Sequence, residues 1–274
     1  MTKQGFEVAG GTDPGCVRRN NEDNFAIDEE LGLMVVADGM GGHNSGEVAS
    51  SLATSTIVEM ARRMLGGEKI MIPEASAGDS GLSPRARLLK YLVRSANTMI
   101  YEKGRAFPRD AGMGTTVVAA LAEPDSLIVA HVGDSRLYLL RQGQLNALTE
   151  DHSLVGDQVR KGLITSEQAS KSDFQNILTR ALGVEKEVEI DVSEHPLLPG
   201  DVLLLASDGL TKMVDDAELG RTISRGDVRG AVETLIGKAR TAGGVDNITV
   251  VVARVPESRG LGGFQGLVSR LFRR

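Results

Sequence analysis

Four aspartates stand at the ends of strongly apolar segments that are widely separated along the chain. Asp38 follows residues 34–37, Asp134 follows 129–133, Asp208 follows 203–207, and Asp246 precedes 247–250. For any one of them, an Asp at a strand end is ordinary turn chemistry. As a set they constrain the fold, because strand ends of a common sheet converge. Buried carboxylates that meet there repel one another unless a cation neutralises them.

The ligand supply indicates which cation such a site would hold. The chain has one cysteine, Cys16, and four histidines, with no His-Glu-x-x-His pair. Oxygen ligands without thiolates favour a hard divalent ion, so we expect magnesium or manganese rather than zinc or copper. Two ions that share a carboxylate would lower the pKa of a water held between them, and this chemistry is typical of phosphoester hydrolysis.

Two other phosphate-handling motifs fail on spacing. The glycine spacing from 41 to 46 imitates a phosphate-binding loop, but the next residue is Glu47, where such a loop needs lysine. A cysteine phosphatase needs an arginine six positions after its nucleophile, and counting from Cys16 gives Glu22. Nucleotide hydrolysis of the first kind and cysteine-based catalysis are therefore excluded.

Composition narrows the class of protein further. Hydrophobic residues make up 41% and charged residues 25% of the 274, which is ordinary for a globular chain with a proper core. The net charge of −6 argues against a nucleic-acid partner. No apolar run approaches the roughly 18 residues of a membrane span, and the first residues lack a signal peptide. We therefore expect a cytoplasmic protein.

Hydrophobic periodicity predicts an α+β domain. Strands are expected at 6–10, 24–28, 33–37, 115–121, 126–132, 136–140, 188–192, 202–206 and 248–253, and helices at about 49–64, 88–100, 216–222 and 227–240. The polar segment 150–171 has a Thr165-x-x-Gln168 capping box, which predicts short helices on an exposed insertion. Strand groups alternating with helix pairs favour antiparallel sheets with helices on their outer faces.

Seven short segments, in this order along the chain, resemble the metal-dependent serine/threonine protein phosphatases of type 2C, the PPM family, in its compact bacterial form. They are residues 17–23 (VRRNNED), 37–43 (ADGMGGH), 114–116 (GTT), 132–136 (VGDSR), 178–183 (LTRALG), 207–210 (SDGL) and 246–249 (DNIT). The resemblance implies two antiparallel sheets packed as a central sandwich and flanked by helix pairs, a four-layer αββα arrangement. It assigns residues 1–255 to the catalytic domain, with a flap at about 150–171.

The resemblance also implies a set of metal ligands. Asp38 would bridge two Mn²⁺ or Mg²⁺ ions, with the Gly39 carbonyl, Asp208 and Asp246 as further ligands. Glu22 and Asp23 would act through metal-bound waters, with Asn247 beside them. Asp134 matches the residue that supports, together with Asp208, a third and weaker metal in bacterial relatives.

Two further residues match the family's catalytic groups. Arg18 fits the phosphate-binding arginine, since a planar guanidinium suits two phosphate oxygens, although the adjacent Arg19 leaves the register open. His43 resembles the histidine that protonates the leaving seryl or threonyl oxygen, and it could equally be a hydrogen-bond donor at a helix start. Apolar neighbours indicate that His131 is a core residue. We expect His152 and His195 in loops.

The implied function is hydrolysis of phosphoserine and phosphothreonine in proteins by a hydroxide activated at a binuclear Mn/Mg centre, without a phosphoenzyme. The chain would oppose a serine/threonine kinase in signalling, with phosphorylated proteins, a cognate kinase or its substrates as partners. Two alternatives stay open: an adaptor that binds phosphoproteins without turnover, and a small-molecule phosphatase on the same scaffold.

The sequence assigns no definite role to two segments. The flap would either select substrates beside the active site, or its charged residues simply form a surface exposed to solvent. Residues 256–274 are glycine-rich and end in apolar residues at near-helical spacing with terminal arginines. This pattern is compatible with a short amphipathic helix that touches anionic lipid or a partner, and equally with a plain tail.

Overall fold

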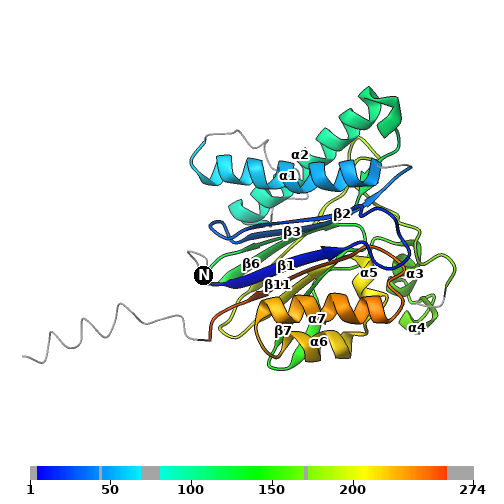
Figure 1. Ribbon diagram of the computed structural model, residues 1–274. Helices are drawn as coiled ribbons and strands as arrows, with labels where there is room; N and C mark the ends of the chain where they lie inside the picture. The colour runs from blue at the N-terminus through cyan, green and yellow to red at the C-terminus, as the bar shows by residue number, and fades with distance from the viewer. Residues whose placement is uncertain (1–4, 43–44, 69–80, 170–171, 258–274) are drawn as a thin grey trace, which may run out of the picture.

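The computed structural model describes residues 5–42, 45–68, 81–169 and 172–257, whose strands form two antiparallel sheets (Figure 1). One sheet has the strand order β1-β11-β10-β7-β8, and the other has the order β2-β3-β5-β6-β9 with β4 paired to β3. The strands are β1 (Glu7–Asp13), β2 (Asp23–Asp28), β3 (Leu33–Met40), β4 (Gly114–Thr115), β5 (Val117–Ala122), β6 (Ser126–Val132), β7 (Arg136–Arg141), β8 (Gln144–Ala147), β9 (Asp191–Pro196), β10 (Val202–Ala206) and β11 (Ile248–Arg254).

Helices cover the outer face of each sheet. The covering helices are α1 (Ser45–Leu65), α2 (Pro84–Ala106), α6 (Asp216–Ile223) and α7 (Val228–Thr241), and the shorter elements are the 3₁₀ turn η2 (Pro108–Asp110), α3 (Leu154–Arg160), α4 (Ser166–Ala169) and α5 (Asp208–Thr211). Side-chain caps start the longer ones: Ser83 accepts from the Ala86 amide at α2, and Asp227 accepts from the Gly230 amide at α7. These caps satisfy amides that lack partners within the helix.

Strand β3 shows why the central strands are continuously apolar. Its residues Leu33, Val35 and Ala37 pack in the cluster beneath α1 and α2, whereas Met34 and Val36 pack in the cluster between the two sheets. Successive side chains of a strand point to opposite faces, and both faces of this strand are buried. The run therefore carries no polar alternation.

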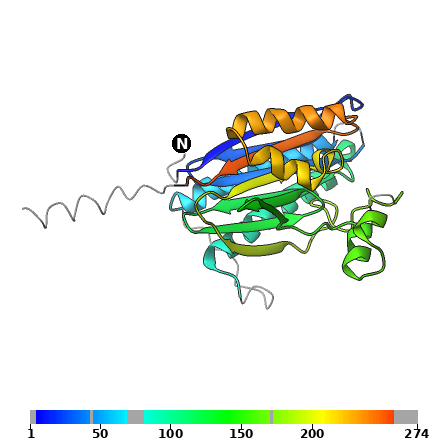
Figure 2. The same ribbon diagram turned by 90° about the horizontal axis from the view of Figure 1, so that it is seen from below.

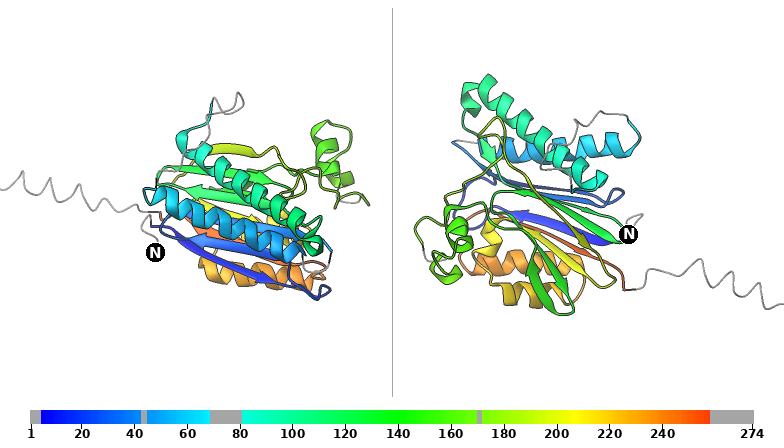
Figure 3. Two further views of the ribbon diagram at one scale, coloured as in Figure 1. Left: turned by 90° about the horizontal axis from the view of Figure 1, so that it is seen from above. Right: turned by 180° about the vertical axis from the view of Figure 1, so that it is seen from behind.

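Three apolar clusters separate four layers. One lies between α1, α2 and the β2-β3-β5-β6-β9 sheet, one lies between the sheets, and one lies between the other sheet and α6 and α7. Figure 1 shows α1 and α2 on one side of the sandwich and α6 and α7 on the other, and Figure 3 shows the same layers from above and behind. The expected αββα sandwich is confirmed.

Two predicted strands differ from those observed. A strand was expected at 188–192, but β9 runs from Asp191 to Pro196. It is an edge strand, and its register is decided by backbone pairing with β6, whereas Val188 packs against the helix-side cluster from an irregular segment. The strand expected at 115–121 is broken at Thr116, where β4 ends and β5 begins.

The predicted flap contains the two short helices α3 and α4, which lie at one end of the sandwich outside its layers (Figure 2). The capping box is confirmed, because the Thr165 amide donates to Gln168 Oε1 at 2.8 Å and the Gln168 amide donates to Thr165 Oγ1 at 3.2 Å. Among the described helices, none is both long and apolar enough to cross a membrane. Of the predicted tail, residues 258–274 lie outside the described residues.

Candidate metal centre

The four aspartates of the sequence pattern meet around one cavity of about 270 Å³, which we call the acidic cavity. It lies where β3, β6 and β10 end and β11 begins. Its lining residues are Arg18, Glu22, Asp38, Gly39, Met40, Gly41, Thr116, Asp134, Asn176, Leu178, Asp208, Asp246 and Asn247. Strand ends from both sheets thus bring together carboxylates that are up to 208 positions apart in sequence.

The backbone of Asp38 is held by the break between β4 and β5. The Asp38 amide donates to Thr116 Oγ1 at 3.0 Å, and the Thr116 amide donates to the Asp38 carbonyl at 2.8 Å. Thr115 Oγ1 donates to the same carbonyl at 2.9 Å. With both of its backbone polar groups fixed, Asp38 keeps its carboxylate directed at the cavity.

Asp23 lies beneath the cavity and links the two sheets. It pairs with Asp38 across β2 and β3 and is 5% exposed. Ser207 Oγ, at the end of β10 in the other sheet, donates to Asp23 Oδ2 at 2.7 Å and accepts from the Thr249 amide at 3.0 Å. Asp23 does not line the cavity itself, so it supports the site from beneath.

Burial and mutual repulsion oppose ionisation of these carboxyls. The pKa of Asp38 is raised well above its ordinary value, first by burial and then by the charges of Asp23 and Asp208. Burial raises the pKa of Asp23 to about 7, and burial together with Asp208 raises the pKa of Asp134 to about 7. A bound divalent cation would offset the free-energy cost of ionising these groups, because its charge favours the ionised form of each carboxyl.

Two oxygens of this group lack hydrogen-bond partners. In the described part of the chain, Asp23 Oδ1 and Asp208 Oδ1 are buried without one. Buried polar atoms are almost always paired with protein or water, so unpaired ones need an explanation. Carboxylate oxygens left open beside an acidic cavity suit a hard divalent cation.

The carboxylates of the acidic cavity are spread around its wall. Within the described residues, only His131, His152 and Asp191 bring three ligand atoms within 4.8 Å of one another. An ion in the acidic cavity would therefore take some of its ligands from water.

Basic side chains contact two of the four aspartates. Arg18 Nη2 lies 2.8 Å from Asp246 Oδ2, and the Arg18 side chain is 55% exposed. Lys212 Nζ forms an ion pair with Asp208 Oδ2. The sequence left open whether Arg18 or Arg19 faces the site. In the structure Arg18 lines the cavity, and Arg19 is not among the lining residues.

The Asn247 side chain holds the backbone around the cavity through hydrogen bonds. Its Oδ1 accepts from the Glu22 amide at 2.8 Å, and its Nδ2 donates to the carbonyls of Pro14 and Asn20 at 3.1 and 2.8 Å. The Asn247 side chain therefore holds the loop that carries Arg18 and Glu22. Burial raises the pKa of Glu22.

Two glycines permit close approach of backbone segments at the site. A Cβ at Gly39 would lie 2.1 Å from the Gly46 carbonyl oxygen, and a Cβ at Gly209 would lie 1.9 Å from the Asn247 carbonyl oxygen. Neither space accepts a side chain. Gly209 thus allows α5, which begins with Asp208, to sit against the segment that carries Asp246.

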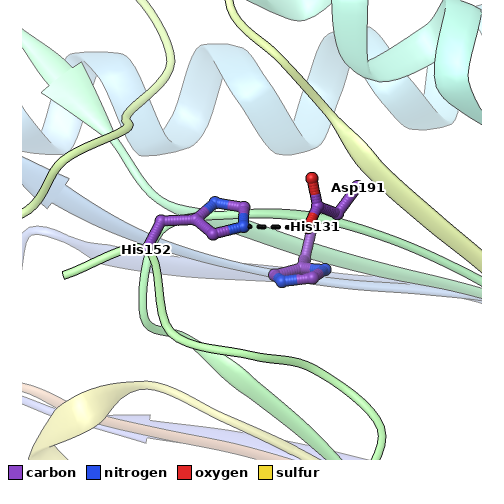
Figure 4. Close-up of side chains that lie close together, drawn as sticks. All are labelled: His131, His152 and Asp191. Carbon is purple, nitrogen blue, oxygen red and sulfur yellow. Dashed lines mark ion pairs between the residues drawn. The ribbon is translucent and has the colours of Figure 1, made fainter. Parts of the chain in front are cut away.

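A second buried polar cluster lies beside the cavity. His131 and His152 stack with ring centroids 4.7 Å apart, and His152 Nε2 lies 3.3 Å from Asp191 Oδ2 (Figure 4). Arg180 Nη1 lies 3.3 Å from His152 Nε2 and 2.8 Å from Asp191 Oδ1. A guanidinium already neutralises this group, so it serves as a structural network rather than a metal site.

Of the two histidines expected in loops, His152 lies in one and His195 does not. His152 lies in the irregular segment between β8 and α3, where it is 1% exposed and accepts from the Gly133 amide at 3.2 Å, so this loop residue is buried. His195 lies in β9 rather than in a loop. The expectation for His131 is confirmed, because it is 6% exposed and its Nε2 lies 2.9 Å from the Glu150 carbonyl.

Sequence reasoning missed three residues at the site. Asn176 and Leu178, which follow the flap, line the acidic cavity, and Lys212 contacts Asp208. Leu178 begins the segment 178–183 that carries part of the resemblance. Lys212 could have been found because a spacing of four residues allows an ion pair with Asp208 across one helical turn, whereas Asn176 left no signal. His43, predicted as a general acid, lies outside the described residues.

Comparison with known proteins is consistent with this geometry. A family model described as Protein phosphatase 2C matches residues 17–237. The chain is 38% identical over 248 residues to the serine/threonine phosphatase stp of Listeria innocua, covering 88% of this chain and 92% of the relative.

Two solved structures are similar in fold. The Mycobacterium tuberculosis serine/threonine phosphatase PstP/Ppp has a TM-score of 0.80 at 35% identity, covering 92% of this chain and 99% of that one. The catalytic domain of the serine/threonine protein phosphatase PstP in complex with two manganese ions has a TM-score of 0.78 at 35% identity, covering 92% and 98%.

The Gly209 contact yields a first prediction. Gly209→Ala forces α5 away from Asn247, so we expect a loss of about 1–3 kcal/mol in the free energy of unfolding and weaker Mn²⁺ binding by calorimetry. Gly237→Ala is the control, because no atom lies within 4 Å of a Cβ in that helical position. It should be neutral or stabilising by about 0.5–1 kcal/mol. Equal behaviour of the two variants would contradict the close-approach argument.

The raised carboxyl pKa values yield a second prediction. Asp23 and Asp134 have folded-state pKa values of about 7, above the ordinary unfolded value of about 3.9. Their contribution to the stability of the metal-free chain is therefore present below about pH 4 and lost as the pH rises through 7. A bound divalent cation offsets that loss.

We therefore expect Mn²⁺ to raise Tm more at pH 8 than at pH 5.5, with chelator-treated protein as the baseline at each pH. The difference arises because ions must displace protons at the lower pH, which weakens binding by about tenfold per pH unit for each proton displaced. A Mn²⁺-induced shift in Tm that is independent of pH would show that these carboxyls do not face the ions.

Proposed function

This chain belongs to the protein phosphatase 2C family, and we propose that it hydrolyses phosphoserine and phosphothreonine in proteins at a pair of Mn²⁺ or Mg²⁺ ions in the acidic cavity. One observation carries the proposal. Carboxylates from both sheets surround a single cavity, and among the described residues Asp208 Oδ1 at the cavity and Asp23 Oδ1 beneath it are buried without hydrogen-bond partners. The proposed reaction forms no phosphoenzyme.

The ligand assignment follows from position around the cavity. Asp38 would contact both ions, with Gly39, Asp208 and Asp246 as further ligands, and all four line the cavity. Glu22 and the deeper Asp23 would act through water. When bound, such a pair of ions supplies an activated water near neutral pH and neutralises charge on the phosphoryl oxygens.

Arg18 would bind the phosphoryl group of the substrate. Its guanidinium is held at the cavity by Asp246, at 2.8 Å, and more than half of its side chain is exposed. Once a cation takes over the Asp246 carboxylate, the guanidinium is free to turn to two phosphate oxygens. Arginine suits this role because its planar fork donates two parallel hydrogen bonds.

His43 would protonate the departing seryl or threonyl oxygen. The chemistry needs such a group, because an alkoxide is a poor leaving group and a histidine titrates near neutrality. The proposal for His43 rests on its place in the segment Asp38-Gly39-Met40-Gly41-Gly42-His43.

Protein substrates are proposed because the cavity adjoins the flap. Asn176 and Leu178, in the segment that follows the flap, form part of the wall of the acidic cavity. A bound phosphoprotein would therefore contact this segment. We propose that residues 1–255 form the catalytic domain and that the enzyme opposes a serine/threonine kinase acting on the same proteins.

The function is tested with purified full-length protein, Mn²⁺ and a phosphothreonine peptide, by measuring released phosphate. Asp38→Asn and Asp246→Asn should each reduce kcat by about 10²-fold or more, because they remove charge that holds the ions. Asp216→Asn, at an exposed position on α6, is the matched control and should keep full activity. Peptide binding by the wild type without phosphate release would support an adaptor instead.

The role of His43 is tested through the leaving group. His43→Ala should slow hydrolysis of phosphoserine and phosphothreonine peptides by about 10²-fold, but slow hydrolysis of p-nitrophenyl phosphate much less, because that leaving group needs no proton. An equal loss on both substrates would assign His43 to phosphate or metal binding, not to proton donation.

A further inference from the structure

The pair Asp134 and Asp208 forms the side of the acidic cavity where a third cation would be expected. Asp134 is 8% exposed, and it lines the acidic cavity together with Asp208. Asp208 Oδ1 is buried without a partner among the described residues. Two carboxylates in this position require positive charge.

Lys212 supplies that charge from within the chain. It follows α5, and its backbone amide donates to the Asp208 carbonyl at 2.9 Å while its Nζ pairs with Asp208 Oδ2. The ammonium thus lies on one of the two carboxylates that would hold a third ion, and Asp134 lines the same cavity as Asp208.

A second contact holds the ammonium. Lys212 Nζ donates to Asn176 Oδ1 at 2.6 Å, and Asn176 comes from the segment after the flap. The Lys212 stem lines a neighbouring cavity of about 570 Å³ under the flap, whereas Asn176 and Asp208 line the acidic cavity. The Lys212 side chain thus reaches the carboxylates from outside the acidic cavity, and 27% of this side chain remains exposed.

We propose that the ammonium group of Lys212 takes the place of the third cation between Asp134 and Asp208, so that this phosphatase holds two exchangeable ions and carries the third positive charge itself. A divalent ion at that position would have to displace a charge that is covalently attached and held by two acceptors. The inference rests on the proposed binuclear centre, and it replaces the expectation of a third metal at Asp134 with a proposal that can be tested.

The experiment counts Mn²⁺ ions bound to the full-length protein, by calorimetry and by electron paramagnetic resonance of free Mn²⁺. The wild type should bind two ions. Lys212→Met keeps the stem but removes the charge, and it should bind a third ion at least about tenfold more tightly than the wild type does. Lys212→Arg restores a cation and should return the count to two.

Two controls locate the effect. Lys238→Met removes a lysine that pairs with Glu218 at 2.8 Å on the far helical layer, and it should bind ions as the wild type does. Adding Asp134→Asn to Lys212→Met should abolish the third ion. Lys212→Gln provides a second neutral variant if Lys212→Met does not fold.

Three outcomes would overturn the inference: a third ion in the wild type with the affinity found in Lys212→Met, an unchanged count in both neutral variants, or a third ion that survives Asp134→Asn. Failure of the proposed function is a separate result, because it would appear as loss of the two ions common to all variants.

Discussion

Electrostatic repulsion among carboxylates at the junction of the two sheets is the constraint on which the site depends. Asp38, Asp134, Asp208 and Asp246 converge on one cavity, with Asp23 directly beneath. Their pKa values shift upward in Asp38, Asp23 and Asp134 because burial and like charge both oppose ionisation. A fold that gathers acids in this way gains nothing from them without cations, so the arrangement indicates function rather than stability.

The scaffold maintains this arrangement by fixing backbone rather than by packing the acids themselves. Thr116 holds both backbone polar groups of Asp38, and Asn247 ties together the loop around Glu22. Ser207 links Asp23 in one sheet to Thr249 in the other. Such neutral hydrogen bonds orient the carboxylates while leaving oxygens such as Asp208 Oδ1 open to a cation.

The chain's own cations divide into two kinds. Arg18 is largely exposed, and within the described part of the chain its ion pair is with Asp246, which suits the phosphoryl-binding role proposed for it. Lys212 is tied to Asp208 and to Asn176, and it approaches from the flap side. One basic side chain is therefore available for substrate while the other belongs to the wall of the site. Asn176, in the segment that follows the flap, lines the acidic cavity and holds Lys212, so changes in this segment would reach the carboxylates through this contact.

The sequence by itself determined the α+β class, most element positions and the identity of the acidic set, because apolar runs and helical periodicity are local consequences of burial, and the resemblance of its motifs to a known family implied the αββα arrangement. It could not place β9, whose register depends on pairing with β6, or recognise His152 as buried, since its partners Gly133 and Asp191 come from other segments. Likewise, only tertiary structure decided that Arg18 rather than Arg19 faces the cavity and that Lys212 meets Asn176. The physical reason is that charged and polar side chains interact with whatever the fold brings within a few ångströms of them, and the order of residues along the chain does not show which distant segments meet.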